Sequence, residues 1–224
     1  MTDTPEPPFN RLDPLNAVLF EKLFGEKGDE TQLLALLKPI LARTNRELDA
    51  VTILDNKDLI PDTIGNKKGI LDIRGKLTDG SRCNIEVQRK RQLDFVRRSL
   101  FYMSYEYAHL LVKGQHYIEI PDVICINILD FNYINLGNEK EQITPGEDFH
   151  TSFHLYEDHH KSCLLTKAIE MHFIEMPKFR AFKQKDIQHN PLHRWLSYLD
   201  IETPLAACWT SPPLPPPDKI SKSR

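Results

Sequence analysis

The chain has 224 residues, of which 40% are apolar and 27% charged, proportions that favour a folded globular protein over a disordered or fibrous one. This length suits one domain with a sizeable core. The formal net charge of -3 argues against a protein that holds nucleic acid by its overall charge, so any such contact has to be local.

The cysteines and the chain start bear on the compartment. Cys83, Cys125, Cys163 and Cys208 are widely spaced and form no CxxC pair, which argues against a zinc site and a disulfide framework. No segment approaches the roughly 18 consecutive apolar residues that span a bilayer, and the polar, proline-rich start does not resemble a signal peptide. We therefore expect a cytoplasmic protein with no membrane partner.

Two helices are expected near the N-terminus. Residues 1–12 look like a flexible lead, and Asp13 followed by Pro14 predicts a helix start, with Asp as the cap and Pro at the first helical position. A second apolar run over residues 33–41 also has helical spacing, although Pro39 should kink or shorten that helix near its end.

Short segments rich in Ile, Val and Leu then predict strands over residues 50–56, 69–77 and 81–88. Between the last two stands Asp79-Gly80, a strong hairpin signal because Gly tolerates the positive φ of a tight turn. These two strands should therefore be antiparallel neighbours.

The second half of the chain continues with helical spacing over residues 93–112 and a nearly continuous apolar run, 122–131, of the kind expected of a strand buried on both faces. Residues 149–157 predict another strand, and residues 167–176 a strand or a helix. The end, 201–224, is rich in proline and then basic, which is typical of a disordered or extended tail. The predicted domain therefore spans residues 13–200.

Polar side chains that suit a metal site occur in the strand over residues 81–88. Strand alternation directs Asn84, Glu86 and Gln88 to one face, while the residues between them are apolar. Asp72 stands in the neighbouring strand, where a partly desolvated carboxylate needs a cation or hydrogen-bond donors. Two carboxylates on adjacent strands can converge, and hard oxygen ligands suit Mg2+ or Mn2+.

The residues alone leave a plainer interpretation open. Asp72 and Glu86 could face solvent or pair with Arg74 or Lys76, and Gln88 could be a solvated residue at the end of its strand.

Together, the run NKKGILDIRGKLTDGSRCNIEVQ, the segment RRSLFYMSYEY and the strand DVICINILDF resemble the PD-(D/E)xK nuclease family transposases, also called recombination-promoting nucleases. The segments NAVLFEKLFG and HFIEMPKF are similar to further parts of that family. The resemblance implies an α/β restriction-endonuclease-like core, with a mixed central sheet flanked by helices and C-terminal additions.

The same resemblance implies a metal-dependent DNA endonuclease that acts in transposition or recombination. By motif match, Asp72 and Glu86 are the metal ligands, and Gln88 is the third catalytic residue in place of the usual Lys. In the opening helix, Ala17 and Glu21 replace the Asp and Lys that are common in relatives, and Glu21 is a candidate accessory acid.

Positive charges cluster after the third strand at Arg89, Lys90, Arg91, Arg97 and Arg98. This stretch suits contact with the DNA backbone, although a charge run is also typical of an ordinary solvated helix face. Lys67 and Lys68, before the Asp72 strand, have the same two interpretations.

Aromatic and histidine side chains raise two weaker hypotheses. Tyr102 and Tyr105 could stack on bases, although aromatics at helical spacing are more often core. His150, His154, His159 and His160 have spacings that fit no standard metal-ligand pattern, and a loop or a strand edge explains them better.

Two other functions remain open at this stage. A degenerate family member could bind DNA or a protein without cutting, and the chain could instead be an RNA-directed or regulatory module. Cutting both strands of a duplex often needs two active sites, so a homodimer is also open.

Overall fold

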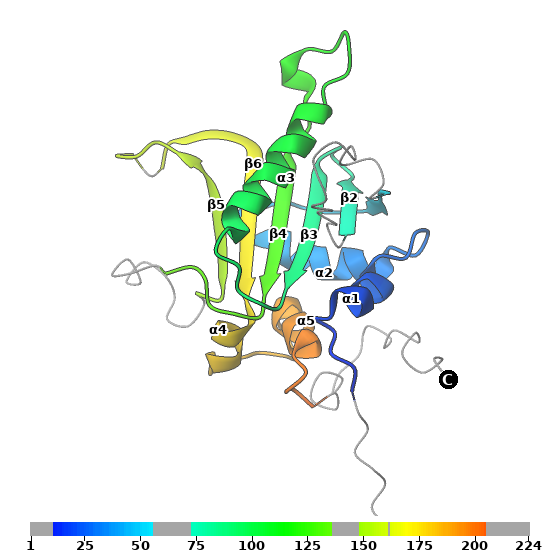
Figure 1. Cartoon of the computed structure of the whole chain (residues 1–224), viewed down its shortest axis with the longest axis vertical. Coiled ribbons are helices and arrows are strands. Elements are labelled where there is room, and N and C mark those ends of the chain that lie inside the picture. The colour runs from blue at the N-terminus through cyan, green and yellow to red at the C-terminus, as the bar shows by residue number, and fades with distance from the viewer. Residues whose placement is uncertain (1–10, 56–72, 136–147, 161, 205–224) are drawn as a thin grey trace, which may run out of the picture.

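The computed structural model describes residues 11–55, 73–135, 148–160 and 162–204. Its helices lie at both ends of the chain and in one long segment between strands (Figure 1). The helices are α1 (Ala17–Phe24), α2 (Thr31–Leu41), α3 (Phe95–His109), α4 (Met176–Ala181) and α5 (Pro191–Leu199), with short 3-10 turns η1 (Ala42–Thr44) and η3 (Tyr117–Glu119).

The described strands form one six-stranded mixed sheet in the order β1-β2-β3-β4-β6-β5. Both edges of the sheet are antiparallel, while β3, β4 and β6 run parallel at its centre. The strands are β1 (Val51–Ile53), β2 (Ile73–Leu77), β3 (Arg82–Gln88), β4 (Val123–Leu129), β5 (His150–Tyr156) and β6 (Leu164–Glu175). A mixed sheet flanked by helices confirms the predicted α/β class.

The hairpin between β2 and β3 is confirmed as well. Gly80 has a φ of +90°, which an L side chain rarely adopts, and Asp79 accepts a hydrogen bond from the Ser81 amide at 2.9 Å. The resulting register pairs Ile73 with Ile85. The turn therefore determines which residues of β2 and β3 share a face.

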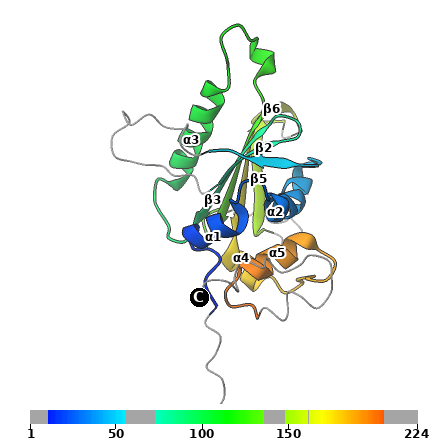
Figure 2. The ribbon, with the colours of Figure 1, turned by 90° about the vertical axis from the view of Figure 1, so that its right-hand side faces the viewer.

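α3 connects β3 to β4 across one face of the sheet, as a parallel pair of strands requires. All seven residues of β4 are buried, which confirms the prediction of a strand covered on both faces. Figure 2 shows the sheet between α3 on one side and α2 on the other.

The two faces of the sheet differ in chemistry. On the α2 face, apolar side chains of α1, α2 and α5 form the large core with residues such as Cys83, Ile85 and Val87. On the α3 face, a smaller apolar cluster gathers around Phe95 and Phe173. The space beneath α3 that this cluster leaves is available to polar groups.

The predicted start of the first helix was wrong. The first helix begins at Ala17 and is capped by Asn16, because Asp13 and Pro14 belong to the preceding turn. Pro39 lies in the last turn of α2, which ends two residues later at Leu41, in agreement with a helix shortened near its end.

The segment with two interpretations, residues 167–176, is a strand: β6 ends at Glu175 and α4 starts at Met176. This segment is a strand and not a helix because its backbone pairs with β4 on one side and β5 on the other. No pattern in the sequence had predicted α5, which buries Trp195 and Leu196 against the large core.

Candidate active site on the face of the sheet beneath α3

The predicted alternation along β3 is present. Cys83, Ile85 and Val87 belong to the large core, whereas Asn84 and Glu86 are buried on the other face and contact side chains of α3. Burial on both faces makes the polar face of β3 an enclosed one. Charged side chains there need partners, because an unpaired buried charge lowers the free energy of unfolding by ~3–5 kcal/mol.

Glu86 is 7% exposed, and its partner is Arg98 of α3. The Arg98 guanidinium donates to the Glu86 carboxylate and, at 3.1 Å, to the Gln88 side-chain oxygen. The Gln88 side-chain amide in turn donates to the Lys90 carbonyl at 3.0 Å. One cation therefore spans the two polar side chains that the family motif singles out in this strand.

Asp72 lies outside the described residues, and so do Lys67 and Lys68. The structure does place its neighbour in the chain: Ile73 opens β2 opposite Ile85. Arg74, one of the two cations suggested as partners for the acids, pairs with Glu106 at 2.9 Å instead and also donates to the Asp55 carbonyl at 2.8 Å.

Glu106 is a buried acid that the sequence interpretation missed. It is 2% exposed, and it accepts hydrogen bonds from Arg74 and from the Asn84 amide. Its spacing from the buried Phe95, Tyr102 and Met103 on α3 is the signal that could have placed it on the inner face. The inner face of α3 thus presents Arg98 to Glu86 and Glu106 to Arg74.

The predicted basic stretch is not one continuous patch. Arg98 points inward to Glu86, Arg89 pairs with Asp13 at 2.8 Å, and Arg91 lies over the Tyr133 ring at 5.8 Å. Lys90 and Arg97 are exposed. The five charges therefore divide between the buried site and the surface beside it.

The remaining candidates separate by burial. Tyr102 is 7% exposed, and burial raises the pKa of its hydroxyl, so it is a packing residue in place of a base-stacking one. Tyr105 is half-buried and lines a cavity together with Ile53 of β1 and Arg74 of β2. Glu21 is exposed on α1, whose other side packs Phe20 and Leu23 into the core.

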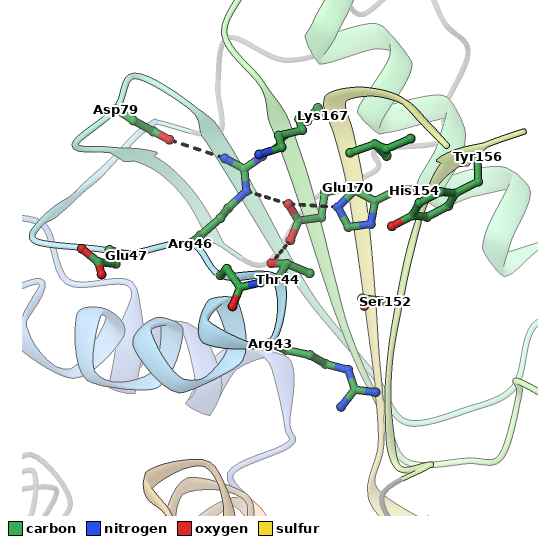
Figure 3. A pocket seen from close by; sticks show the side chains of 12 residues that line it. Arg43, Thr44, Arg46, Glu47, Asp79, Ser152, His154, Tyr156, Lys167 and Glu170 are labelled. Atoms are coloured by element: carbon green, nitrogen blue, oxygen red, sulfur yellow. Dashed lines mark hydrogen bonds and ion pairs between the residues drawn. The ribbon is translucent and has the colours of Figure 1, made fainter. Parts of the chain in front are cut away.

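A second polar cluster lies on the α2 face of the sheet, around Glu170 of β6 (Figure 3). Glu170 is 1% exposed and accepts hydrogen bonds from Thr44, from Arg46 at 2.6 Å and from His172 at 2.6 Å. Burial alone would raise the pKa of Glu170, but these hydrogen bonds outweigh it and lower the pKa to about 2.

The histidines of β5 join this cluster. His150 lies 2.9 Å from His172, and burial holds its pKa well below the ordinary value. His154 lies 3.5 Å from Glu170. Both are on the edge strand, as their sequence pattern favoured, whereas His159 and His160 lie beyond its end.

The cavity beside Glu170 has a volume of about 570 Å³ and mixes both signs of charge. Arg46 crosses it to reach Glu170, Asp122 at 2.7 Å and Asp79. These ion pairs join the end of η1 to β6, to the start of β4 and to the β2–β3 turn. The cluster therefore serves as a clamp between elements.

The donor chemistry of the Glu86 face suits a hard divalent ion, since it offers a carboxylate and an amide oxygen beside a position that already attracts a cation. Within the described ranges, no group of three or more His, Cys, Asp or Glu side chains could hold a metal by itself. No helix in the described part of the chain is long and apolar enough to cross a membrane.

Comparison with known proteins gives one match. The sequence model of the family described as PD-(D/E)XK nuclease family transposase matches residues 14–207, which is most of the chain and includes β2, β3, α3 and β4. No curated protein and no solved structure matches.

Proposed function

Because the chain belongs to the PD-(D/E)XK nuclease family transposases, we propose that it is a metal-dependent DNA endonuclease whose active site is the Glu86 face of β3. One observation carries the proposal: Glu86 is buried beneath α3, with Gln88 on the same face and Arg98 across both. The setting would be transposition or recombination, as the family description suggests.

In this proposal Asp72 is the second metal ligand. Ile73, the residue after Asp72, pairs with Ile85, the residue before Glu86. Residues paired across antiparallel strands share a face, so the two carboxylates would converge from adjacent strands. The ion would be Mg2+ or Mn2+, which oxygen ligands favour.

A bound divalent ion would lower the pKa of a water molecule and neutralise charge on the phosphodiester. The protein's own residues do the rest. Gln88 orients the water or a phosphate oxygen, and Arg98 brings the positive charge that Gln88 cannot supply in the usual Lys position. Lys90, Arg91 and Arg97 hold the DNA backbone at the edge of the site.

A second candidate function is binding of DNA or a protein partner without cutting. The ion pair between Arg98 and Glu86 favours it, since this pair already neutralises the carboxylate. The two functions differ in whether Glu86 ever ligates a metal.

Plasmid nicking in the presence of Mg2+ separates them. We expect the native chain to nick the plasmid and the variants Asp72→Ala and Glu86→Gln to be inactive, because each variant lacks a charged metal ligand. Asp186→Asn is the matched control: Asp186 is an exposed acid beside His189, away from β3, and its loss should leave nicking unchanged. Equal nicking by the native chain and both site variants would sink the catalytic assignment.

A further inference from the structure

A row of aromatic rings runs along α3, from the exposed Phe101 to Tyr105 and His109 beside β1 and β2. Phe101, Tyr105 and His109 follow each other at intervals of four residues, which places them on one line of the helix surface. The ring centroids of Phe101 and Tyr105 are 6.3 Å apart, and Tyr105 and His109 stack at 4.0 Å. Arg97 stands one turn before Phe101 on the same line.

This aromatic row is not part of the core. The buried side chains of α3 are Phe95, Ser99, Tyr102, Met103 and Glu106, and they face the sheet. Phe101 is 46% exposed, and His109 is exposed too. Figure 1 is viewed from the side of the sheet that α3 covers.

A cavity of about 430 Å³ opens beside the far end of the row, with Tyr105, His109 and Arg82 among its lining. Its other charged groups are paired with each other: Arg74 with Glu106, and Lys27 with Asp55. Arg82 contributes the remaining positive charge, and its guanidinium donates to the Gly80 carbonyl at 3.4 Å.

The charge along the row suits a polyanion. Arg97 is exposed at its start, and Glu106, the acid between Arg97 and His109, points inward to Arg74. Arg98, the next residue after Arg97, contacts Glu86. The row therefore leads away from the proposed active site and has positive charge at both ends.

We propose that the aromatic row binds the unpaired bases of a single DNA strand on its way to or from Glu86. Exposed rings give bases a sequence-independent stacking surface, and the arginines at its ends neutralise phosphates. The inference rests on the proposed function for the identity of the strand as DNA.

The test measures fluorescence anisotropy of a labelled oligothymidine with the full chain in chelator, so that no cutting occurs. We expect Phe101→Ala and Tyr105→Ala each to weaken binding about tenfold, the loss of one stacked base. Tyr105→Phe keeps the ring and should bind as the native chain does. Tyr156→Ala is the matched control, because Tyr156 is a 45% exposed ring on β5, away from the row.

The salt dependence of binding separates stacking from charge. Tyr105→Ala should leave the slope of log affinity against log salt unchanged, whereas Arg97→Gln should reduce its magnitude by about 0.7, the value for one phosphate contact on a single strand. Native affinity in both ring variants would overturn the inference. The inference would also be overturned if light scattering showed that the ring variants lose self-association while their DNA affinity is unchanged. That result would assign the row to contact with a second copy of the chain.

These outcomes are distinguishable from failure of the proposed function. Nicking by the native chain together with unchanged DNA binding by the ring variants would refute the row alone. Row-dependent binding of oligothymidine by a native chain that never nicks plasmid would refute the hydrolysis alone.

Discussion

At the residue scale, the decisive contact is the one between Arg98 and Glu86. A guanidinium that holds a carboxylate competes with a metal for the same oxygen atoms, yet it also places positive charge where a phosphate would be cut. The same side chain would therefore oppose metal binding and favour the reaction.

Replacement of Arg98 should separate these two effects. In Arg98→Gln we expect Mn2+ to bind more tightly than in the native chain, because its competitor is gone, while nicking falls by about 100-fold, the scale of one lost electrostatic contact in a transition state. Titration calorimetry with Mn2+ and plasmid nicking check the two halves. Weaker Mn2+ binding in the variant would contradict competition at Glu86.

At the scale of elements, α3 is held to the sheet by polar contacts as well as by apolar ones. Near its start Arg98 reaches β3, and near its end Glu106 reaches Arg74 of β2 and Asn84 of β3. Apolar packing there is confined to a small cluster around Phe95 and Met103. The orientation of α3 therefore depends on buried ion pairs.

We predict that removing one partner of the Arg74–Glu106 pair destabilises the fold more than replacing both partners with apolar residues. Glu106→Gln leaves the buried charge of Arg74 uncompensated and should lower the free energy of unfolding by about 3 kcal/mol. The double variant Arg74→Met with Glu106→Met should lose less, since no charge stays buried. Urea unfolding of both chains measures this, and a double variant less stable than Glu106→Gln would contradict the argument.

At the scale of the whole molecule, the cluster around Glu170 couples stability to pH. Its carboxylate is held by Arg46, His172 and Thr44, with His154 nearby, and its pKa falls from 4.5 to about 2. A depressed carboxyl pKa stabilises the fold above the unfolded value, and this contribution is lost as the pH falls from about 4.5 through 2.

The lost stability should be on the order of 3 kcal/mol over that range, at about 1.4 kcal/mol per pKa unit. His150 adds in the same direction from a higher pH: its pKa is lowered by burial, so the unfolded chain takes up the proton first as the pH falls below the ordinary histidine value. Urea unfolding across this pH range measures the slope. In Glu170→Gln the part below pH 4.5 should flatten, and an unchanged slope there would refute the assignment.

The sequence by itself determined the local features. The alternation of polar and apolar residues along β3, the Asp79-Gly80 turn and the apolar run of β4 predicted a hairpin, a buried strand and the face on which Glu86 and Gln88 lie. Such features follow from the period of a strand and the φ of a turn, which depend on neighbouring residues. The family resemblance rested on these same segments.

Only the tertiary structure decided which groups meet. Arg98 lies 12 residues from Glu86, and Arg74 lies 32 from Glu106, so their pairing depends on how α3 packs over the sheet. The same packing buried Tyr102, left Phe101 exposed and left Tyr105 half-buried. Helical spacing determines which residues share a face of a helix. Which element packs against that face depends on how the whole chain buries its apolar side chains.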